Sequence, residues 1–410
     1  MEGRTGAEPM AAPVILQILP ELVTGGVEQG TVDMAQAIVQ QGWTALVVSE
    51  GGPMVRELTR VGAEHIEMAV KSKNPFRIRS NASRLAKLIR ERGVSVIHAR
   101  SRAPAWSAFW AAKMTGVPFV TTFHGTYSLG LLGLKRKYNR VMTQGHRVIA
   151  ISRFIARHVA ANYDMDLDRL RVVHRGIDLA RFNPGAVSAE RMIRLATRWR
   201  LPDGAPVIML PGRLTRWKGQ IVLIEALARL ERSDVRCLLV GSDQGREGYT
   251  EELQELIRKR GLEGQVHLIQ DCDDMPAAYM VTDVVVSAST DPEAFGRVVA
   301  ESQAMGRPVI APDHGAAPEV VKAGATGWLV PPKDPEALAA ALRTALAMDE
   351  EDRQAVAEEA MDHVRTLFSK AVMTERTLYV YKELLYGSPP LETGRPWEDS
   401  GSPSPEVFSS

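Results

Sequence analysis

Two glutamates, Glu293 and Glu301, stand on either side of a Phe-Gly pair, a pattern that can bind hydroxyl and phosphate groups. A helix is expected to begin after Gly296, which puts Glu301 in its second turn and Glu293 in the preceding loop. Backbone N–H groups at this helix start, those of Phe295, Gly296 and Arg297, attract an anion because the helix dipole adds to their own charge. Each carboxylate can hold a pair of hydroxyls beside that anion. The alternative is a pair of surface glutamates without a ligand.

A basic loop after the predicted strand Val207–Leu210 supplies the complementary charge. Gly212 allows a sharp exit from the strand, and Arg213 and Lys218 place two cations at its end. Arginine offers a planar fork and lysine a point charge, which together suit a pyrophosphate. Basic residues in loops are commonly only solvated. The nearby glutamate segment is what favours a ligand-binding role for this loop.

Adjacent glycines, Gly25 and Gly26, stand before a predicted helix near the start of the chain. They let backbone N–H groups approach an oxyanion at the helix N-terminus. Glu50, which ends the next strand, makes a nicotinamide dinucleotide site a hypothesis to weigh. The spacing, however, is G-G-x-x-x-G rather than the G-x-G-x-x-G of such sites. A plain tight turn is the remaining alternative.

Short β-branched runs alternate with amphipathic segments, such as the helix expected over Val27–Gln41, and this alternation predicts parallel α/β units. Ligands of open parallel sheets bind at the carboxyl ends of strands, which is where the loops described above fall. The predicted strands are Val14–Leu19, Thr44–Ser49, Val96–Ala99, Phe119–Thr121, Val148–Ile151, Val207–Leu210, Val235–Val240, Val266–Ile269, Val284–Ser287 and Val309–Ala311.

The pattern breaks at Asn183-Pro184-Gly185 and then starts afresh, which predicts two Rossmann-type domains in series. We assign residues 13–185 to the first domain and 186–386 to the second, whose last helix is expected to pack back toward the first. Residues 1–12 are expected to be a flexible N-terminus. Residues 387–410 are rich in Pro, Gly and Ser, which predicts a disordered tail.

The composition is that of a soluble globular protein, since 45% of the 410 residues are hydrophobic and 24% are charged. It excludes collagen, a coiled-coil rod and wholesale disorder. No apolar run approaches the roughly 20 residues of a membrane-spanning helix, and residues 1–13 lack the apolar core of a signal peptide. Two cysteines, Cys237 and Cys272, fit a reduced compartment, so a cytoplasmic location is expected.

Charge is distributed unevenly behind a net charge of +1. Residues 1–185 carry 25 basic and 14 acidic side chains, whereas the remainder carries 25 basic and 35 acidic ones. Between residues 68 and 163, 18 basic residues accompany a single acid, Glu91. Such a block indicates an anionic partner, namely nucleic acid, a membrane surface or an acidic substrate. The alternative is a solvated basic face.

These motifs together resemble those of retaining glycosyltransferases of family 4, and the resemblance covers residues 14–385. The amino-acid sequence around the first glycines and the Phe-Gly pair is most similar to that of bacterial enzymes that build lipopolysaccharide and related envelope glycans. The resemblance implies the GT-B fold, an α/β architecture of two facing Rossmann-like domains with parallel sheets and an interdomain cleft. The motifs that carry it are Gly25-Gly26-Val27-Glu28, Gly212-Arg213 with Lys218-Gly219, Glu293-Ala294-Phe295-Gly296 with Glu301, and Gly306-Arg307-Pro308-Val309-Ile310.

The resemblance implies a nucleotide-sugar donor, linked to UDP or GDP, with no separate cofactor. Arg213 and Lys218 would bind the donor diphosphate and stabilise charge on the leaving group. Glu293 would hydrogen-bond hydroxyls of the transferred sugar, and Glu301 would take the ribose hydroxyls of the nucleotide. His124, which follows the strand Phe119–Thr121 and precedes a glycine, matches a histidine that faces the transferred sugar.

The remaining contacts implied by the resemblance are mostly made by the backbone. The N–H groups of Phe295 and Gly296 would steady sugar and phosphate, and the stretch Val266–Asp274 would cup the nucleobase. The glycine pair would line the acceptor side of the cleft. The substrate-binding residues implied in this way are Gly25, Gly26, Phe295, Gly296, Arg297 and Glu301.

The sequence departs from the family pattern at Ala316, where a second glycine is usual. This substitution puts a phosphate contact at that position in doubt. Asp271 and Asp273 form a D-x-D that binds a metal in other glycosyltransferases, but here it falls at the nucleobase position. No histidines have the spacing of a zinc site, so no metal is expected. His98 ends a strand and either faces the cleft or is a satisfied core histidine.

The basic block belongs to the predicted acceptor domain. In residues 76–92 a helix would place Leu85, Leu88 and Ile89 on one side and four basic side chains on the other, although the three apolar residues could instead face the core. Residues 127–138 place an apolar tip beside Lys135-Arg136-Lys137. Both segments suit docking on anionic lipid or on a phosphorylated lipid-linked acceptor. We therefore expect peripheral association with the inner face of the cytoplasmic membrane, and a glycan or lipid-linked acceptor.

The sequence thus favours a retaining glycosyltransferase of the hexosyltransferase type, acting in lipopolysaccharide or envelope polysaccharide synthesis. A nucleotide-sugar epimerase on the same fold is one alternative, and it would need no acceptor. A non-enzymatic binder of an anionic polymer is another, but it leaves the paired glutamates and cations without a role. Nucleic acid is not an expected partner because no RNA-binding aromatic motif accompanies the charge. A nicotinamide dehydrogenase is the third alternative.

Overall fold

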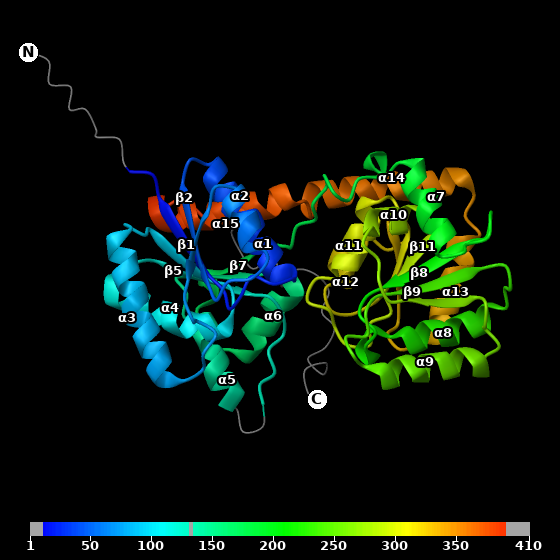
Figure 1. Ribbon diagram of the computed structural model, residues 1–410, viewed down its shortest axis with the longest axis horizontal. Coiled ribbons are helices and arrows are strands. Elements are labelled where there is room, and N and C mark those ends of the chain that lie inside the picture. Colours follow the sequence, from blue (N-terminus) through cyan, green and yellow to red (C-terminus); the bar gives the residue numbers. More distant parts are fainter. Residues whose placement is uncertain (1–10, 131–133, 391–410) are drawn as a thin grey trace, which may run out of the picture. The chain divides into compact units, whose positions relative to one another are not determined.

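The computed structural model describes residues 11–130 and 134–390, and each structural statement below concerns these residues. They form two compact units: one runs up to Val173 and resumes at Met373, and the other runs from His174 to Val372 (Figure 1). The division comes before the Asn183-Pro184-Gly185 cluster at which the sequence alone divides the chain. The residues between belong to the second unit, where the Phe182 ring lies 6.1 Å from that of Tyr279.

The first unit contains seven strands and six complete helices. Its strands are β1 (Val14–Ile18), β2 (Thr44–Ser49), β3 (Glu64–Glu67), β4 (Val96–Ala99), β5 (Phe119–Phe123), β6 (Arg147–Ala150) and β7 (Leu170–Val172). Its helices are α1 (Gly26–Gln40), α2 (Val55–Arg60), α3 (Pro75–Glu91), α4 (Arg102–Thr115), α5 (Leu134–Asn139) and α6 (Arg153–Asn162). The final helix, α15 (Lys370–Tyr386), begins in the second unit and ends in the first.

The second unit repeats the same alternation of strand and helix. Its strands are β8 (Val207–Pro211), β9 (Arg236–Val240), β10 (Val266–Ile269), β11 (Val284–Val286), β12 (Val309–Pro312) and β13 (Gly327–Val330). Its helices are α7 (Ala189–Arg198), α8 (Gln220–Leu230), α9 (Glu247–Lys259), α10 (Met275–Met280), α11 (Arg297–Ala304), α12 (Ala317–Val320), α13 (Pro335–Leu346) and α14 (Glu350–Leu367).

Both sheets are parallel throughout, and both reverse their strand order beside their first strand. The order is β3-β2-β1-β4-β5-β6-β7 in the first unit and β10-β9-β8-β11-β12-β13 in the second. Ligands of open parallel sheets bind outside the carboxyl ends of strands at such a reversal. The loops that follow β1 and β4 in one unit, and β8 and β11 in the other, are therefore the places where a site is expected.

Most predicted strands are confirmed to within one or two residues, and Thr44–Ser49, Val96–Ala99 and Val266–Ile269 match at both ends. Three strands were not predicted from the sequence. β3 reads Glu-His-Ile-Glu and so lacks an apolar run, β7 has only three residues, and β13 opens on a glycine. All three are edge strands, and their pairing and packing in the folded protein determine the strand conformation that their local sequence does not predict.

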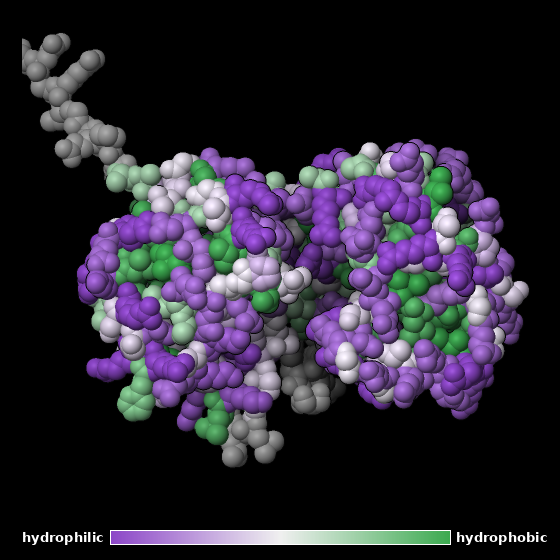
Figure 2. Space-filling model, viewed as in Figure 1, coloured by the Kyte–Doolittle hydropathy of each residue, from purple (hydrophilic) through white to green (hydrophobic). Residues whose placement is uncertain are grey.

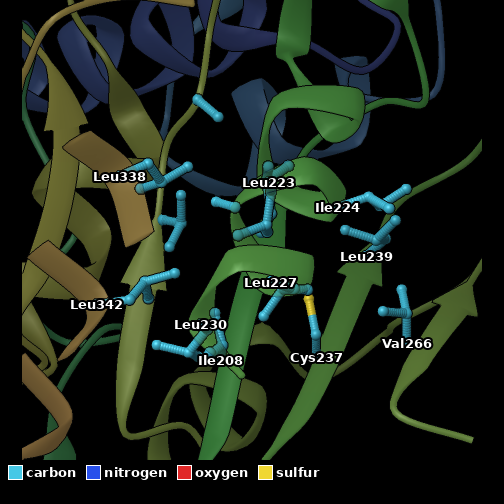
Figure 3. Packing of buried hydrophobic residues seen from close by; sticks show 14 of the residues in the cluster. Ile208, Leu223, Ile224, Leu227, Leu230, Cys237, Leu239, Val266, Leu338 and Leu342 are labelled. Carbon is cyan, nitrogen blue, oxygen red and sulfur yellow. The ribbon is translucent and has the colours of Figure 1, made fainter. Parts of the chain in front are cut away.

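The core of the second unit lies between its sheet and helices α8, α9 and α13, which cover one face, while α10, α11 and α14 cover the other (Figure 1). Helix α8 presents Leu223, Leu227 and Leu230 to the sheet, and Figure 3 shows them packed over strand residues and beside Leu338 of α13. Cys237 of β9 is fully buried in this layer, and burial raises the pKa of its thiol. It is therefore a core residue.

The first unit has a comparable core, and α15 completes it. Ile15 and Val47 from the sheet pack with residues of α1 and α2 and with Leu378, Val380 and Tyr381 of α15. Glu383 of the same helix is buried and accepts from two strand arginines at 2.7 and 2.8 Å. These contacts explain why the residues after Met373 group with the first unit.

No helix in the described part of the chain is long and apolar enough to cross a membrane. The predicted flexible N-terminus and disordered tail lie largely outside the described residues, which begin at 11 and end at 390. Residues 387–390 of the predicted tail form no helix or strand.

Candidate active site

The loop after β8 lies at the strand-order reversal of the second unit and is held on one side by the neighbouring strand β9. Gly212 leaves the strand with φ +151° and donates its N–H to the Val240 carbonyl at 2.8 Å. Gln220, at the start of α8, donates from its side-chain amide to the Arg213 carbonyl at 3.0 Å. The Arg213 side chain is exposed, and no carboxylate of the described residues pairs with it. Its guanidinium is therefore available to an external anion.

The second cation of this loop, Lys218, already has a partner within the predicted site. Its ammonium lies 2.7 Å from Oε1 of Glu293, and the two side chains are only 13% and 19% exposed. Ser289 donates its hydroxyl to the same carboxylate oxygen. The Lys218 Nζ also lies 4.4 Å from the centre of the Trp217 ring. The structure thus brings together two of the residues that the sequence selected, one from each of two adjacent strand ends.

The loops after β8 and β11 also contact each other through the backbone. Thr290 donates its N–H to the Trp217 carbonyl at 2.7 Å. Gly219 adopts φ +72°, and a Cβ there would lie 1.8 Å from the Ala288 carbonyl oxygen, so only glycine permits this approach. Close contact between the two loops therefore fixes the spacing between Lys218 and Glu293.

Glu301 occupies the second turn of α11, as predicted, and is only 8% exposed. It accepts from the Tyr279 hydroxyl at 3.0 Å and from Arg297 Nη2 at 2.9 Å. Burial raises the pKa of this carboxyl, although the charge of Arg297 and both hydrogen bonds oppose the rise. A buried carboxylate with two fixed donors is suited to hold hydroxyl groups in a defined orientation.

The start of α11 is free of side-chain capping, as an anion site requires. Gly296 is the N-cap residue with φ +83°, and no side chain hydrogen-bonds to the first-turn N–H groups. Arg297 begins the helix, and its guanidinium extends along the helix to Glu301, one turn further on. Phe295 is 3% exposed, so its ring anchors the loop in the unit while its backbone remains at the helix start.

The segment with the departure from the family pattern packs directly on Glu293. Gly315 has φ +63°, and a Cβ there would lie 2.7 Å from the backbone N and O of Glu293. Ala316 donates its N–H to the Glu293 carbonyl at 2.9 Å and has φ −94°, which any residue adopts. The glycine that the geometry requires is therefore present, and alanine at the next position carries no strain.

The segment expected to cup the nucleobase ends in a pair of ion-paired aspartates. Asp274 caps α10 by accepting from the Ala277 N–H and also pairs with Arg191 at 2.6 Å. Asp273 lies 3.3 Å from Arg198. Among the described residues, no group of three His, Cys, Asp or Glu side chains is arranged to hold a metal ion.

The other predicted site residues lie in the first unit. Gly25 is the N-cap of α1 and Gly26 its first residue, so the glycine pair follows the strand at the reversal of that sheet. His124 follows β5 and is partly buried. These three residues thus lie on carboxyl-end loops of the first unit, whereas the cations and glutamates lie on such loops of the second.

His98 is a core residue and does not face a ligand site. It is fully buried in β4 between two hydroxyl groups, with Nδ1 2.7 Å from the Tyr381 hydroxyl and Nε2 2.7 Å from Thr122 Oγ1. Burial lowers the pKa of this imidazole well below its usual value, so it is neutral. Of the two possibilities that the sequence left open, the satisfied core histidine is the one found.

Sequence reasoning missed two residues that hold the predicted carboxylates. Ser289 contacts Glu293 from the end of β11, and Tyr279 contacts Glu301 from α10. The serine follows a strand that was predicted, so its position at a strand end was a usable signal. The tyrosine reaches its partner through tertiary packing, which no local pattern reveals.

Two Rossmann-like units with this topology define the class of protein, since they form the GT-B fold of glycosyltransferases. Family profiles agree: "Glycosyl transferases group 1" matches residues 194–363 and "Glycosyltransferase Family 4" matches residues 24–181. The chain belongs to this glycosyltransferase family, in which the sequence motifs had placed it.

Individual relatives support the same assignment. A D-inositol 3-phosphate glycosyltransferase of Catenulispora acidiphila is 30% identical over 325 residues, covering 73% of this chain and 74% of that protein. One from Corynebacterium efficiens is 33% identical over 228 residues, or 54% of this chain. The chain spans about half the length of that relative, 53%. The crystal structure of a glycosyltransferase from Rickettsia africae has 37% identity and a TM-score of 0.86, covering 92% of this chain and all of that one.

Proposed function

We propose that this protein transfers a sugar from a nucleoside-diphosphate-sugar, linked to UDP or GDP, to an acceptor hydroxyl with retention of the anomeric configuration. The observation that carries the proposal is the arrangement at the β8/β11 strand ends. There an exposed Arg213 and the half-buried Lys218–Glu293 pair lie on the loops that precede the uncapped start of α11. Cations and a helix N-terminus suit a diphosphate, and carboxylates beside them suit sugar hydroxyls.

The reaction breaks the bond between the anomeric carbon and the diphosphate oxygen and forms one between that carbon and the acceptor oxygen. The bonding electrons leave with the diphosphate, which also receives the acceptor proton. We assign Arg213 and Lys218 to stabilising the charge that grows on the diphosphate, the dominant contribution in such a site. No Asp or Glu is placed by motif as a covalent nucleophile, which supports attack from the same face and hence retention.

Donor binding must redistribute the existing contacts. Lys218 is bound to Glu293, so a diphosphate has to compete with that carboxylate for the ammonium. Once Lys218 turns to the phosphate, Glu293 is released to accept from the sugar hydroxyls, and Glu301 accepts from the ribose. In the first unit, His124 is our candidate for contacting the transferred sugar, and Gly25 and Gly26 for the acceptor.

The surface of the first unit supports an anionic acceptor and an anionic membrane surface as partners. Phe76, at the start of α3, is 85% exposed, and Leu134, at the start of α5, is 66% exposed. Figure 2 shows apolar atoms at the lower edge of this unit, over α3 and α5. The apolar side of α3 is occupied, because Leu85 and Ile89 are buried where α3 packs against α4. Membrane contact would therefore involve the helix ends and the basic outer face.

Two acceptor classes follow from different observations. The amino-acid sequence of the motifs favours a glycan or lipid-linked acceptor in lipopolysaccharide or envelope polysaccharide synthesis, with the protein at the inner face of the cytoplasmic membrane. The names of the curated relatives favour inositol 3-phosphate. Inositol 3-phosphate and a phosphorylated lipid-linked acceptor are both anionic and fit the basic first unit. Transfer assays with inositol 3-phosphate and with a phosphorylated lipid-linked saccharide distinguish them, and NMR of the product reports the anomeric configuration.

The test of the donor site is thermal stability of the protein with UDP, GDP, ADP or NAD, each with and without EDTA. A ligand at 100 times its dissociation constant stabilises the folded state by about 2.7 kcal/mol, a readily measured shift. We expect a shift with UDP or GDP that survives EDTA. A shift with NAD alone would favour the dehydrogenase. Donor conversion without any acceptor would favour the epimerase.

Membrane association is tested separately by sedimentation with anionic vesicles at low and high salt. We expect binding that weakens as salt screens the basic face. Protein that stays in solution with anionic vesicles at low salt would contradict this part of the proposal. It would leave the donor site unaffected.

A further inference from the structure

The two segments in which the chain passes between units lie side by side. The chain enters the second unit at His174 and leaves it after Val372. Ile177 forms an isolated parallel bridge with Ser369: its N–H donates to the Phe368 carbonyl at 2.7 Å, and its carbonyl accepts from the Lys370 N–H at 2.8 Å. Both passages of the chain between the units adjoin this double segment, which we call the linker (residues 174–178 and 368–372).

Two further contacts make the linker compact. A Cβ on Gly176 would lie 2.6 Å from Cα of Lys370, so the segments approach as closely as glycine allows. The Lys370 ammonium lies 2.9 Å from Oδ2 of Asp178. Backbone and side-chain bonds therefore hold the two segments as one element.

Helix α15 extends from this linker into the first unit. It begins at Lys370, and its later turns place Leu378 and Tyr381 in the core of the first unit. An α-helix transmits a rotation of one end to the other because its backbone hydrogen bonds keep it rigid. The orientation of the linker thus determines the direction in which the helix enters that core.

The loop between β11 and α11, residues 287–296, carries Glu293, and we call it the donor loop. It contacts the linker first through aromatic rings. Phe295 lies between Glu293 and the start of α11, and its ring packs edge-on against Phe368 at a centroid distance of 5.7 Å. Phe368 is 1% exposed and stands directly before the linker residue Ser369. A shift of the donor loop therefore displaces a ring that is part of the linker.

A second route from the donor loop to the linker consists of polar contacts. The Glu293 carbonyl accepts from the Ala316 N–H, and α12 follows directly after Ala316. Glu319 of α12 lies 2.9 Å from Nε2 of His174, the first residue of the second unit. The routes meet because the His174 ring packs edge-on against Phe368 at 5.2 Å.

We propose that His174 and Phe368 are positioning residues that couple occupancy of the donor loop to the orientation of α15 and hence of the first unit. This inference rests on the proposed function. Donor binding must move the Lys218–Glu293 pair, and both routes begin at or beside Glu293. Close-packed rings have discrete arrangements and do not deform continuously, so a small change at the loop is passed on as a change of packing at the linker.

The experiment measures the distance between spin labels at Ser83 on α3 and Thr344 on α13, both exposed, with and without saturating UDP or GDP. Cys272 is replaced by serine, and Cys237 is fully buried. We expect nucleotide to shift the distance in the wild-type background. The shift should be lost in F368L, which keeps an apolar side chain, and reduced in H174A, which removes a partly exposed ring. Nucleotide affinity should change by less than about threefold, while kcat falls by about 10- to 100-fold.

The matched control is H363A. His363 packs on the same Phe368 ring at 5.2 Å, but it belongs to α14 and lies in neither the donor loop nor the linker. Its removal should lower stability and preserve the nucleotide-induced shift. An unchanged shift and kcat in both F368L and H174A would overturn the coupling while leaving the proposed function intact. A wild-type protein that binds nucleotide without any shift would do the same. Failure to bind either nucleotide would overturn the proposed function itself.

Discussion

The two units share one topology, yet they use the strand-order reversal of their sheets in opposite ways. At the β8/β11 reversal, Arg213 and Lys218 stand on the loops, outside the sheet. At the equivalent β1/β4 reversal, the polar side chains turn inward: His98 is fully buried, and Arg100, 6% exposed, donates from Nε to Gln17 at 2.7 Å. The loop after β1 leads into the glycine pair at the start of α1.

This difference shows that the fold determines where a site can form, while the side chains at that place determine its chemistry. The second unit holds a charged site whose members restrain each other through ion pairs. The first unit builds a satisfied internal network and presents its positive charge on its helices. A small, strongly charged ligand suits the former, and an extended anionic partner suits the latter. The predictions below test this contrast.

The largest effect is expected in the charged site, from K218A and R213A. Each removes a cation that opposes charge on the leaving diphosphate, so turnover should fall by about 100- to 1000-fold. Nucleotide affinity should fall far less, because the helix start and the remaining cation still bind the diphosphate. Steady-state transfer rates and calorimetric titration with UDP or GDP measure the two quantities.

The matched control for this prediction is R216A. Arg216 lies in the same loop, but it is exposed and already paired with Glu252. Its removal should leave turnover nearly unchanged. Comparable losses of affinity and turnover in K218A would refute the leaving-group role.

The next effect should appear in the first unit, and in stability alone. H98A removes the His98 partner of the buried Thr122 hydroxyl and one partner of the Tyr381 hydroxyl, which also bonds Arg100, and this should cost about 1–3 kcal/mol. Nucleotide affinity, which depends on the second unit, should not change. Denaturant unfolding and nucleotide titration of the same preparation check both statements, and a loss of affinity without a loss of stability would contradict them.

His98 also predicts a dependence on pH. Its folded-state pKa is depressed, so its contribution to stability is present above the unfolded value of about 6.5 and is lost as the pH falls toward the folded value. H98A should therefore lose less stability than the wild type between pH 7.5 and pH 5.5, two values chosen on either side of about 6.5. Unfolding curves at both pH values give the comparison.

His98 shows what sequence could and could not predict. The strand that carries it was predicted at both ends, because parallel strands appear as short apolar runs. The direction of its side chain depends on Tyr381, which is distant in sequence, so no local pattern could reveal it. The loops of Lys218 and Glu293 were predictable because glycines and charges at strand ends are local signals. The existing ion pair between Lys218 and Glu293 depends on tertiary packing, so the sequence did not predict it.

A smaller effect is expected from E301Q, which keeps the shape of a residue assigned to the ribose. Loss of the charge should weaken nucleotide binding by about tenfold, since hydrogen bonds to charged groups are worth more than neutral ones. Stability at neutral pH should not decrease. The folded-state pKa of Glu301 is raised, so its contribution to stability diminishes as the pH rises above about 4.5. Nucleotide titration and thermal unfolding at neutral pH test the two halves, and unaltered affinity would exclude the ribose role.

The smallest effect is expected where the chain departs from its family. Ala316 has an ordinary backbone conformation, and its N–H is already bonded to the Glu293 carbonyl. A316G therefore restores the common residue without freeing a phosphate contact, and nucleotide affinity should stay within about twofold, while the extra freedom of the unfolded chain costs about 0.5–1 kcal/mol. G315A is the contrasting variant, because its φ of +63° and the 2.7 Å approach to Glu293 leave no room for a methyl group. It should disturb the loop of Glu293 and lower both stability and affinity. If A316G instead tightened nucleotide binding clearly, the backbone at 316 would contact phosphate after all, and the donor site would rearrange more on binding than its existing contacts indicate.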